Sequence, residues 1–379
     1  MSTKIEWTDA TWNPMVGCSR ASPGCDHCYA EGQVHRFGAR YDRPTTIKLG
    51  LTGRGGGLTF LPKDGDGKPL GKGAKWTGAV WLLPDVLGVP LRRRKPTRYF
   101  VNSLSDVFHP SVVGCEEGRR FIAAMFGVMA ATPQHTYQIL TKRPDQAREW
   151  FAWAQSLCDV LPIGDEIMRI ARQLVPGRAD DIVLATMRAR NPWPLPNVWI
   201  GASVEDQLSA DGRIPALLEV PAAVRFLSAE PMLGPVHILD HDRVAGVSTR
   251  GASGIDWVIC GGESGAKARP MHPDWARSLR DQCVEAGAGF FFKQWGEWTA
   301  DHSAAGMLIS AGGPLPEHFA EGAKDGILWT TVIESTNRKR VGERVPYILV
   351  DGQAHRLFKV GKAKAGRELD GRTWDEMPE

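Results

Sequence analysis

One pattern recurs along most of this chain: a short apolar run, a polar or glycine-containing turn, and then apolar residues at helical spacing. The runs lie at 99–101, 135–140, 197–200, 224–227, 256–260 and 289–292, and helices are expected at 116–131 and 274–286. Successive units of this kind build a parallel sheet. We therefore predict an α/β fold, a partial or full (β/α) barrel, whose functional groups gather at the carboxyl ends of the strands.

The places where this pattern is interrupted predict the domain organisation. A chain of 379 residues can bury one large core with insertions. We expect residues 1–298 to form the barrel, with a first strand near 8–14 and insertions at about 44–98 and 154–196. The first insertion is rich in glycine, proline and lysine and should have little core of its own, whereas the second holds an amphipathic helix near 165–174. Residues 299–379 should form a small β-rich extension over the barrel, with hairpin strands at 327–333 and 347–358.

Hydropathy and charge bear on the location of the protein and on its possible partners. No apolar run approaches the roughly 18 residues of a membrane helix, so we expect a soluble cytoplasmic protein with no membrane contact. The net charge of +3 does not by itself indicate a nucleic-acid partner. Two local basic runs, Arg92-Arg93-Arg94-Lys95 and 338–340, could be solvated surface or could meet phosphates.

Cys18, Cys25 and Cys28 form a cluster near the N-terminus. Three thiolates on one loop can hold three irons of a four-iron cubane and leave the fourth iron open to a ligand. A closed zinc site needs four protein ligands, and His27 or His35 could supply the fourth, so zinc stays an alternative. A disulfide is less favoured, because no signal-peptide pattern precedes the cluster and the chain has an odd number of cysteines, 7.

With these cysteines at the start of a βα pattern, the chain resembles the radical S-adenosylmethionine (SAM) superfamily, in which the open iron of a [4Fe-4S] cluster binds SAM. The usual C-x3-C-x2-C spacing is replaced here by C-x6-C-x2-C. The whole chain resembles a phage and prophage family of unknown function that carries the longer spacing, often described as a three-cysteine-motif protein found beside a dedicated partner protein. The matching segments are 5–14, 102–109, 140–144, 201–205, 229–234, 260–265, 293–296 and 359–378. The resemblance implies a partial barrel of the radical SAM type.

The strand order is also similar to that of the superfamily branch containing spore photoproduct lyase, a DNA repair enzyme. In that branch, polar residues after the second strand, a lysine after the third and a serine after the fourth line the SAM site. The residues at matching places here are Ser105, Asp106, Lys142 and Ser203. A carboxylate or hydroxyl can bind the ammonium or ribose of SAM, and a lysine can pair with its carboxylate. Each alone could be a strand-end cap, but their joint occurrence favours a cofactor site.

Three further residues near strand ends have open readings. Glu263 ends a Gly-Gly-Glu motif, but the superfamily motif of that form follows the second strand, so its role does not transfer by position. Glu263 could contact adenosine or substrate, or face solvent in a turn, and Glu230 is similarly placed. Cys260 could donate a hydrogen atom to a substrate radical or could be a small core residue.

The resemblance implies an enzyme that takes an electron from an external donor and cleaves SAM reductively to methionine and a 5′-deoxyadenosyl radical, which abstracts hydrogen from a substrate. Phage context and the lyase-like pattern favour a nucleic acid or modified nucleotide as substrate, contacted by Arg92 to Lys95 and by exposed tryptophans. One alternative is a non-catalytic zinc-binding nucleic-acid adaptor, closed by His27. Another is a βα-barrel hydrolase in which the cysteines are incidental.

Overall fold

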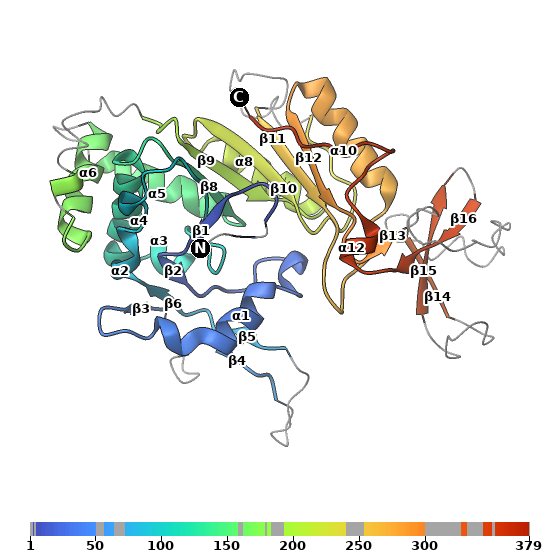
Figure 1. Cartoon of the computed structure of the whole chain (residues 1–379), viewed down its shortest axis with the longest axis horizontal. Helices are drawn as coiled ribbons and strands as arrows, with labels where there is room; N and C mark the ends of the chain where they lie inside the picture. The colour runs from blue at the N-terminus through green and yellow to red at the C-terminus, as the bar shows by residue number, and fades with distance from the viewer. Residues whose placement is uncertain are drawn as a thin grey trace.

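A curled sheet of seven parallel strands, a half-barrel, lies at the centre of the computed structural model (Figure 1). The structure describes residues 3, 5–50, 57–63, 73–157, 162–178, 180–182, 193–239, 254–299, 327–331, 344–350 and 353–378. In sheet order the strands are β1 (Ala10–Trp12), β7 (Arg98–Val101), β8 (Thr136–Thr141), β9 (Val198–Ser203), β10 (Val224–Ala229), β11 (Trp257–Gly261) and β12 (Gly289–Gln294). Each strand pairs in parallel with its predecessor in this order, which confirms the predicted α/β fold and is compatible with a partial barrel.

The central strands are buried on both faces, as expected for parallel strands. All five residues of β11 are buried. Because side chains alternate along a strand, Trp257 and Ile259 join an aromatic cluster with Phe226 on one face, whereas Val258 and Cys260 join the main core on the other face. The position of Cys260 in β11 therefore directs its thiol into the main core.

Helices follow most of the strands and supply the outer layer. The principal helices are α4 (Glu116–Ala130), α5 (Pro144–Ser156), α6 (Ile163–Leu174), α8 (Gln207–Leu218) and α10 (Pro273–Ala286), and the shorter ones are α2 (Pro84–Leu87), α3 (Pro110–Val113) and α12 (Lys362–Ala365). The predicted helices at 116–131, 165–174 and 274–286 are confirmed by α4, α6 and α10. The N-terminus of α8 is fixed by a capping box between Asp206 and Ser209, which also sets the course of the chain leaving β9.

The first insertion forms short strands, and its buried side chains share a cluster with Val16 and Val34, which lie outside the insertion. Its strands β3 (Ile47–Leu49) and β6 (Val80–Leu82) form an antiparallel sheet with β2 (Met15–Val16), and β4 (Thr59–Phe60) pairs with β5 (Lys75–Trp76). Trp81 and Leu83 pack with Val34 of helix α1 (Tyr29–Phe37) in a separate buried cluster. Figure 1 shows this unit below the half-barrel. The insertion therefore builds a small layer around the cysteine segment.

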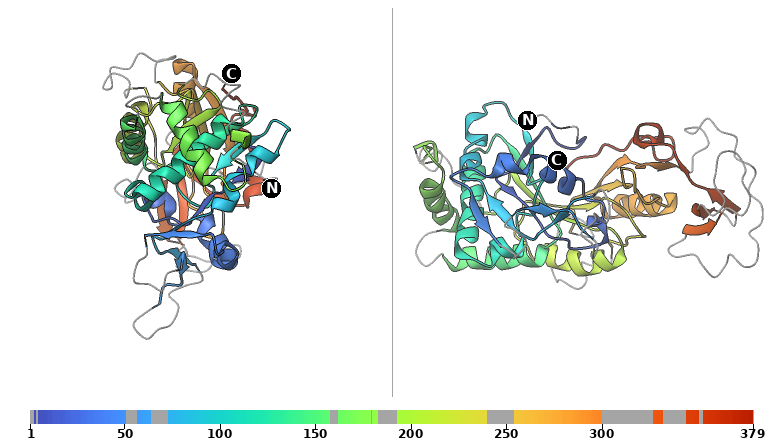
Figure 2. Two further views of the ribbon diagram at one scale, coloured as in Figure 1. Left: turned by 90° about the vertical axis from the view of Figure 1, so that its left-hand side faces the viewer. Right: turned by 90° about the horizontal axis from the view of Figure 1, so that it is seen from below.

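The C-terminal region contains the predicted hairpin strands. β14 (Ile327–Thr331), β15 (Arg344–Val350) and β16 (Gln353–Arg356) form an antiparallel sheet, seen at one end of the molecule in the right panel of Figure 2. β13 (Trp298–Thr299) pairs with β17 (Phe358–Lys359), so the domain boundary expected at 298/299 falls inside a strand. The chain then returns along β12, where the Phe292 amide donates to the Trp374 carbonyl at 2.9 Å. None of the helices in the described ranges combines the length and apolarity needed to cross a membrane.

Candidate functional site

The three clustered cysteines lie on a loop at the carboxyl edge of the half-barrel. We call residues 18–28 the cysteine loop; it follows β2, passes through η1 (Pro23–Cys25) and ends where Cys28 begins helix α1. Gly17 forms a β-bridge with Ser105, which follows β7, and this pairing fixes the start of the loop beside that strand end. All three thiols are free and half-buried.

Burial further favours the protonated form of two of these thiols. Desolvation raises the pKa of Cys18 to about 12, with a further contribution from the nearby Asp106 carboxylate. Burial also raises the pKa of Cys28. Because metal ligands must be thiolates, a bound cation would have to displace these protons.

Arg143 contacts Cys18, the first cysteine of the loop. Its Nη1 lies 3.8 Å from Cys18 Sγ and 2.9 Å from the Asp106 carboxylate, and its Nη2 donates to Ser19 at 2.9 Å. The guanidinium side chain is only 10% exposed. Arg143, which directly follows Lys142 at the end of β8, therefore joins two strand ends to the start of the cysteine loop.

His109 completes this network in its neutral form. Its Nδ1 accepts a hydrogen bond from the Ser111 amide, so Nε2 carries the ring proton and donates to Ser19 Oγ at 2.8 Å. Burial and the nearby Arg143 lower the pKa of His109 to about 4. The Ser19 hydroxyl accepts from both His109 and Arg143, which leaves its own proton available to a third group.

Glu205 holds the middle of the cysteine loop from the end of β9. Its carboxylate pairs with Lys142 and with Arg213, the latter at 2.8 Å, and accepts a hydrogen bond from Ser22 Oγ at 2.8 Å. Burial alone would raise the pKa of Glu205, but Lys142 and Arg213 lower it by more. The net pKa of this carboxyl is therefore below its usual value. A Cβ on Gly24 would lie 2.6 Å from Glu205 Cγ, so only glycine fits where the loop meets this side chain.

Glu263 holds the far end of the loop from the end of β11. Arg269 binds both carboxylate oxygens, at 2.7 and 2.8 Å, and also donates to the Pro23 carbonyl at 3.0 Å. His27 Nδ1 lies 3.0 Å from the same carboxylate. Burial raises the pKa of Glu263, and Arg269 more than offsets that rise. Two strand-end glutamates therefore hold the cysteine loop from different parts of the sheet.

The other sequence-predicted residues have partners within the protein. Ser105 Oγ donates to the Met15 carbonyl at 3.1 Å, and Ser203 is buried at the end of β9. Glu230 pairs with Lys293 at 2.8 Å. Cys260 is fully buried, 3.8 Å from the sulfur of Met232, and this setting favours a core role over hydrogen donation. The strand-end residues thus share one edge with the cysteine loop, but four of them already carry ion pairs: Asp106, Lys142, Glu230 and Glu263.

Sequence reasoning missed four residues of this site: His109, Arg143, Glu205 and Arg269. Three of them lie in or directly beside predicted strand-end segments, so position along the chain was the available signal. In the part of the chain that the structure describes, no group of three or more His, Cys, Asp or Glu side chains is arranged to hold a metal ion.

A cavity of about 370 Å³ opens beside the loop, with Cys25 on its wall. The insertion strand β5 contributes Lys75 and Trp76 to the lining. Lys75 Nζ donates to the Asp26 carbonyl at 2.8 Å and pairs with Glu31 at 3.0 Å. The first insertion thus closes over the cysteine loop and leaves Cys25 facing an open space.

Comparisons with known proteins place the chain in a family. No curated protein and no solved structure matches it. A family model described as protein of unknown function (DUF5131) matches residues 2–378, nearly the whole length. The chain belongs to the DUF5131 family.

Proposed function

We propose that this protein is a radical SAM enzyme in which Cys18, Cys25 and Cys28 hold a [4Fe-4S] cluster. The observation that carries the proposal is the position of the cysteine loop, at the carboxyl edge of a curled parallel sheet and tied to several of its strand ends. Ligand and catalytic groups of parallel α/β folds gather at this edge. The proposal includes a half-barrel of the radical SAM type and a cytoplasmic location.

The donor set suits an iron–sulfur cluster with one open iron. Three free thiols sit on one half-buried loop, and Arg143 lies 3.8 Å from Cys18 Sγ, where its charge would offset that of a thiolate-bound cluster. When bound, the cluster and SAM supply a one-electron reductive cleavage that yields methionine and a 5′-deoxyadenosyl radical able to abstract hydrogen from a substrate. The electron comes from an external donor.

The strand-end residues are the proposed SAM ligands: Ser105, Asp106, Lys142, Ser203, Glu230 and Glu263. Four of these residues already form ion pairs within the protein, which a bound ligand would have to replace. Lys142 and Lys293 are the cations that can accept a carboxylate, and Glu230 can accept an ammonium group. Binding a zwitterion here would exchange an internal ion pair for one with the ligand, and the buried surroundings would strengthen it.

The proposed substrate is a nucleic acid or a modified nucleotide, and a dedicated three-cysteine-motif protein is a proposed partner. The cavity beside Cys25 supports access of a second molecule to the loop. Arg20 and Lys75 line it, but each already pairs with an acidic side chain, Asp26 and Glu31 respectively.

One observation favours a second candidate, the zinc-binding adaptor. His27 lies between Cys25 and Cys28 and places Nδ1 against Glu263, which leaves Nε2 for another partner. Metal-bound histidines commonly give their other ring nitrogen to a carboxylate in this way. Three cysteines and His27 would then make a closed site without chemistry of its own.

Anaerobic reconstitution separates the two candidates. We expect about four irons and matching sulfide per chain, and 5′-deoxyadenosine on addition of SAM and dithionite. Cys25→Ala should abolish both, whereas Cys115→Ala should leave both intact, because Cys115 lies outside residues 18–28 and its thiol bonds to Ser111 and Gly118. Zinc in place of iron, with no SAM cleavage, would overturn the radical enzyme and support the adaptor.

A further inference from the structure

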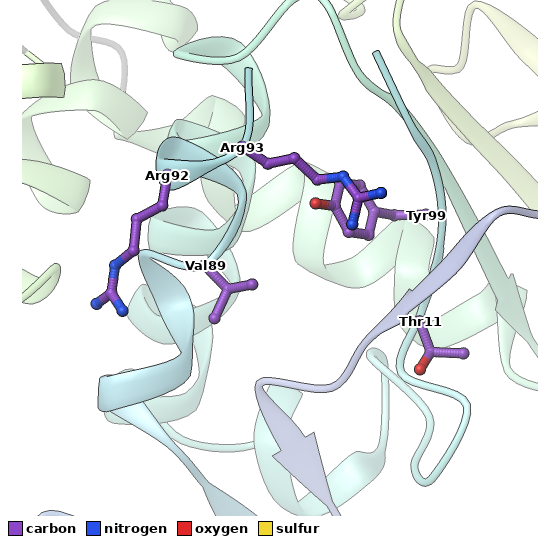
Figure 3. Close-up of a pocket in the computed structure, with 5 residues that line it drawn as sticks. All are labelled: Thr11, Val89, Arg92, Arg93 and Tyr99. Carbon is purple, nitrogen blue, oxygen red and sulfur yellow. The ribbon is translucent and has the colours of Figure 1, made fainter. Parts of the chain in front are cut away.

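A second cavity, also of about 370 Å³, lies on strands β1 and β7 and is lined by Thr11, Val89, Arg92, Arg93 and Tyr99 (Figure 3). We call it the basic pocket. Its volume falls within the roughly 300–1,000 Å³ of small-molecule sites. It shares no lining residue with the cavity at Cys25, and the cysteine loop begins only after the end of β1.

The basic pocket presents positive charge without a carboxylate on its wall. Arg92 and Arg93 are exposed, as are Arg94 and Lys95 beyond them. Within the described ranges, none of these four side chains forms an ion pair. Asp9, which precedes β1, is engaged by Arg98, whose amide donates to it at 2.8 Å. Arg93 already hydrogen-bonds the Tyr99 side chain and helps to lower the pKa of the nearby Asp9 carboxyl, so Arg92 is the pocket guanidinium most available to an external anion.

The pocket wall is held in place before any ligand arrives. His135 Nε2 donates to the Arg93 carbonyl at 2.9 Å and lies 3.3 Å from the Pro90 carbonyl, which fixes the turn η3 (Pro90–Arg92). Tyr99 is 2% exposed and stacks on Tyr137, with ring centroids 5.6 Å apart. A preformed site loses less conformational entropy on binding.

Figure 3 shows how the side chains divide the space. Arg93 extends toward Tyr99, Arg92 leaves the same turn in another direction, and Val89 lies between them. Val89 is an exposed apolar residue, 39% accessible. The pocket thus combines two guanidinium groups with one apolar contact, which suits a phosphate attached to a sugar or base.

We propose that the basic pocket binds a phosphate group of a nucleotide or nucleic acid. Arginine forks donate paired hydrogen bonds to phosphate oxygens, so Arg92 and Arg93 are the proposed phosphate ligands. Arg94 and Lys95 extend the positive surface, so a neighbouring phosphate of a polynucleotide can be met as well. The inference rests on the proposed function for its choice of nucleic acid as ligand, but phosphate binding itself requires neither cluster nor SAM.

Binding measurements on the full chain without SAM test this site. The probes are inorganic phosphate, adenosine 5′-monophosphate and a single-stranded DNA of about 12 nucleotides. We expect R92Q/R93Q to weaken the binding of the DNA at least tenfold and to reduce the slope of log K against log salt by about 1 to 2. The matched control is Arg172→Gln, which removes an exposed guanidinium on helix α6 and should change neither.

The outcomes separate the ligand sources and the two proposals. Equal loss for the mononucleotide and the DNA assigns the pocket to a single nucleotide, whereas loss for the DNA alone assigns it to a polynucleotide; either supports the site. The triple variant C18A/C25A/C28A should keep its phosphate binding, even if SAM cleavage is never observed. Unchanged binding in R92Q/R93Q, or an equal loss in Arg172→Gln, would overturn the pocket.

Discussion

The Ser22 hydroxyl donates a hydrogen bond of 2.8 Å to the Glu205 carboxylate, across 183 positions of the sequence. The same carboxylate pairs with Lys142 and Arg213, and its side chain is only 1% exposed. One buried anion therefore balances two cations and also holds the middle of the cysteine loop. Glu205 is therefore one of the residues that position the loop.

Replacing Glu205 should be costly. Glu205→Gln leaves Lys142 and Arg213 without their shared anion, and we expect the free energy of unfolding to fall by about 3 kcal/mol, because breaking a buried pair leaves uncompensated charge. Glu219→Gln removes an exposed partner of Arg148 and should cost less than about 1 kcal/mol. Urea titrations of both variants measure the difference. Equal losses would show that Glu205 is solvated rather than structural.

Stability should fall in acid partly through His109. Its pKa is about 4 in the folded chain and 6.5 ordinarily, so the unfolded chain binds the extra proton between these values. The contribution of neutral His109 to the free energy of unfolding is therefore fully present above pH 6.5 and is lost as the pH falls toward 4. Between pH 7 and pH 5 the loss from this group should be about 2 kcal/mol. In His109→Asn, the free energies of unfolding measured by urea titration at pH 7 and pH 5 should differ by about 2 kcal/mol less than in the unsubstituted protein. An unchanged difference would assign the acid sensitivity to other groups.

Adding one methyl group at Gly24 should disturb the loop. The new Cβ of Gly24→Ala would lie 2.6 Å from Glu205 Cγ, and overpacking of this kind costs about 1–3 kcal/mol. The amount of iron bound after reconstitution should also be lower in Gly24→Ala. The matched control is Gly32→Ala on helix α1, where a Cβ would meet nothing within 4 Å. This substitution should raise the free energy of unfolding by about 0.5–1 kcal/mol. Full iron loading in Gly24→Ala would show that the loop can move aside.

The cysteines should differ sharply in their reactivity toward iodoacetamide. Cys25 faces an open cavity and should be modified early in the metal-free protein. Cys260 and Cys283 are buried, burial raises the pKa of both thiols, and they should react only after unfolding. Mass spectrometry of timed samples gives the order. Modification of Cys260 at the rate of Cys25 would reveal a path to its thiol and favour hydrogen donation over a core role.

The sheet could be predicted from the sequence because its strands are continuous apolar runs. Val258 and Ile259 illustrate this, since a strand buried on both faces needs no polar alternation. The first insertion could not be read in the same way. Its β6 has only three residues, Val80–Leu82, inside a glycine- and proline-rich stretch, and its core appears only once β2 and α1 pack against it.

The candidate site was predictable in position but not in pairing. Lys142 and Asp106 were expected at strand ends and do lie there, yet their partners Glu205 and Arg143 come from other strand ends. No local pattern records such contacts, because the curl of the sheet decides which strand ends meet. The cofactor roles of these residues stay predictions.

The long reach of the two glutamate contacts has a consequence for synthesis. The cysteine loop emerges early, but Glu205 follows Ser22 by 183 residues and Glu263 follows His27 by 236. At about 5–20 residues per second, the ribosome needs on the order of ten seconds or more to deliver both glutamates. During that interval the thiols of a nascent chain have no fixed setting. Oxidants and stray metals in the cell can therefore reach them before the native contacts form, so the rate of translation itself becomes a variable in obtaining correctly assembled protein.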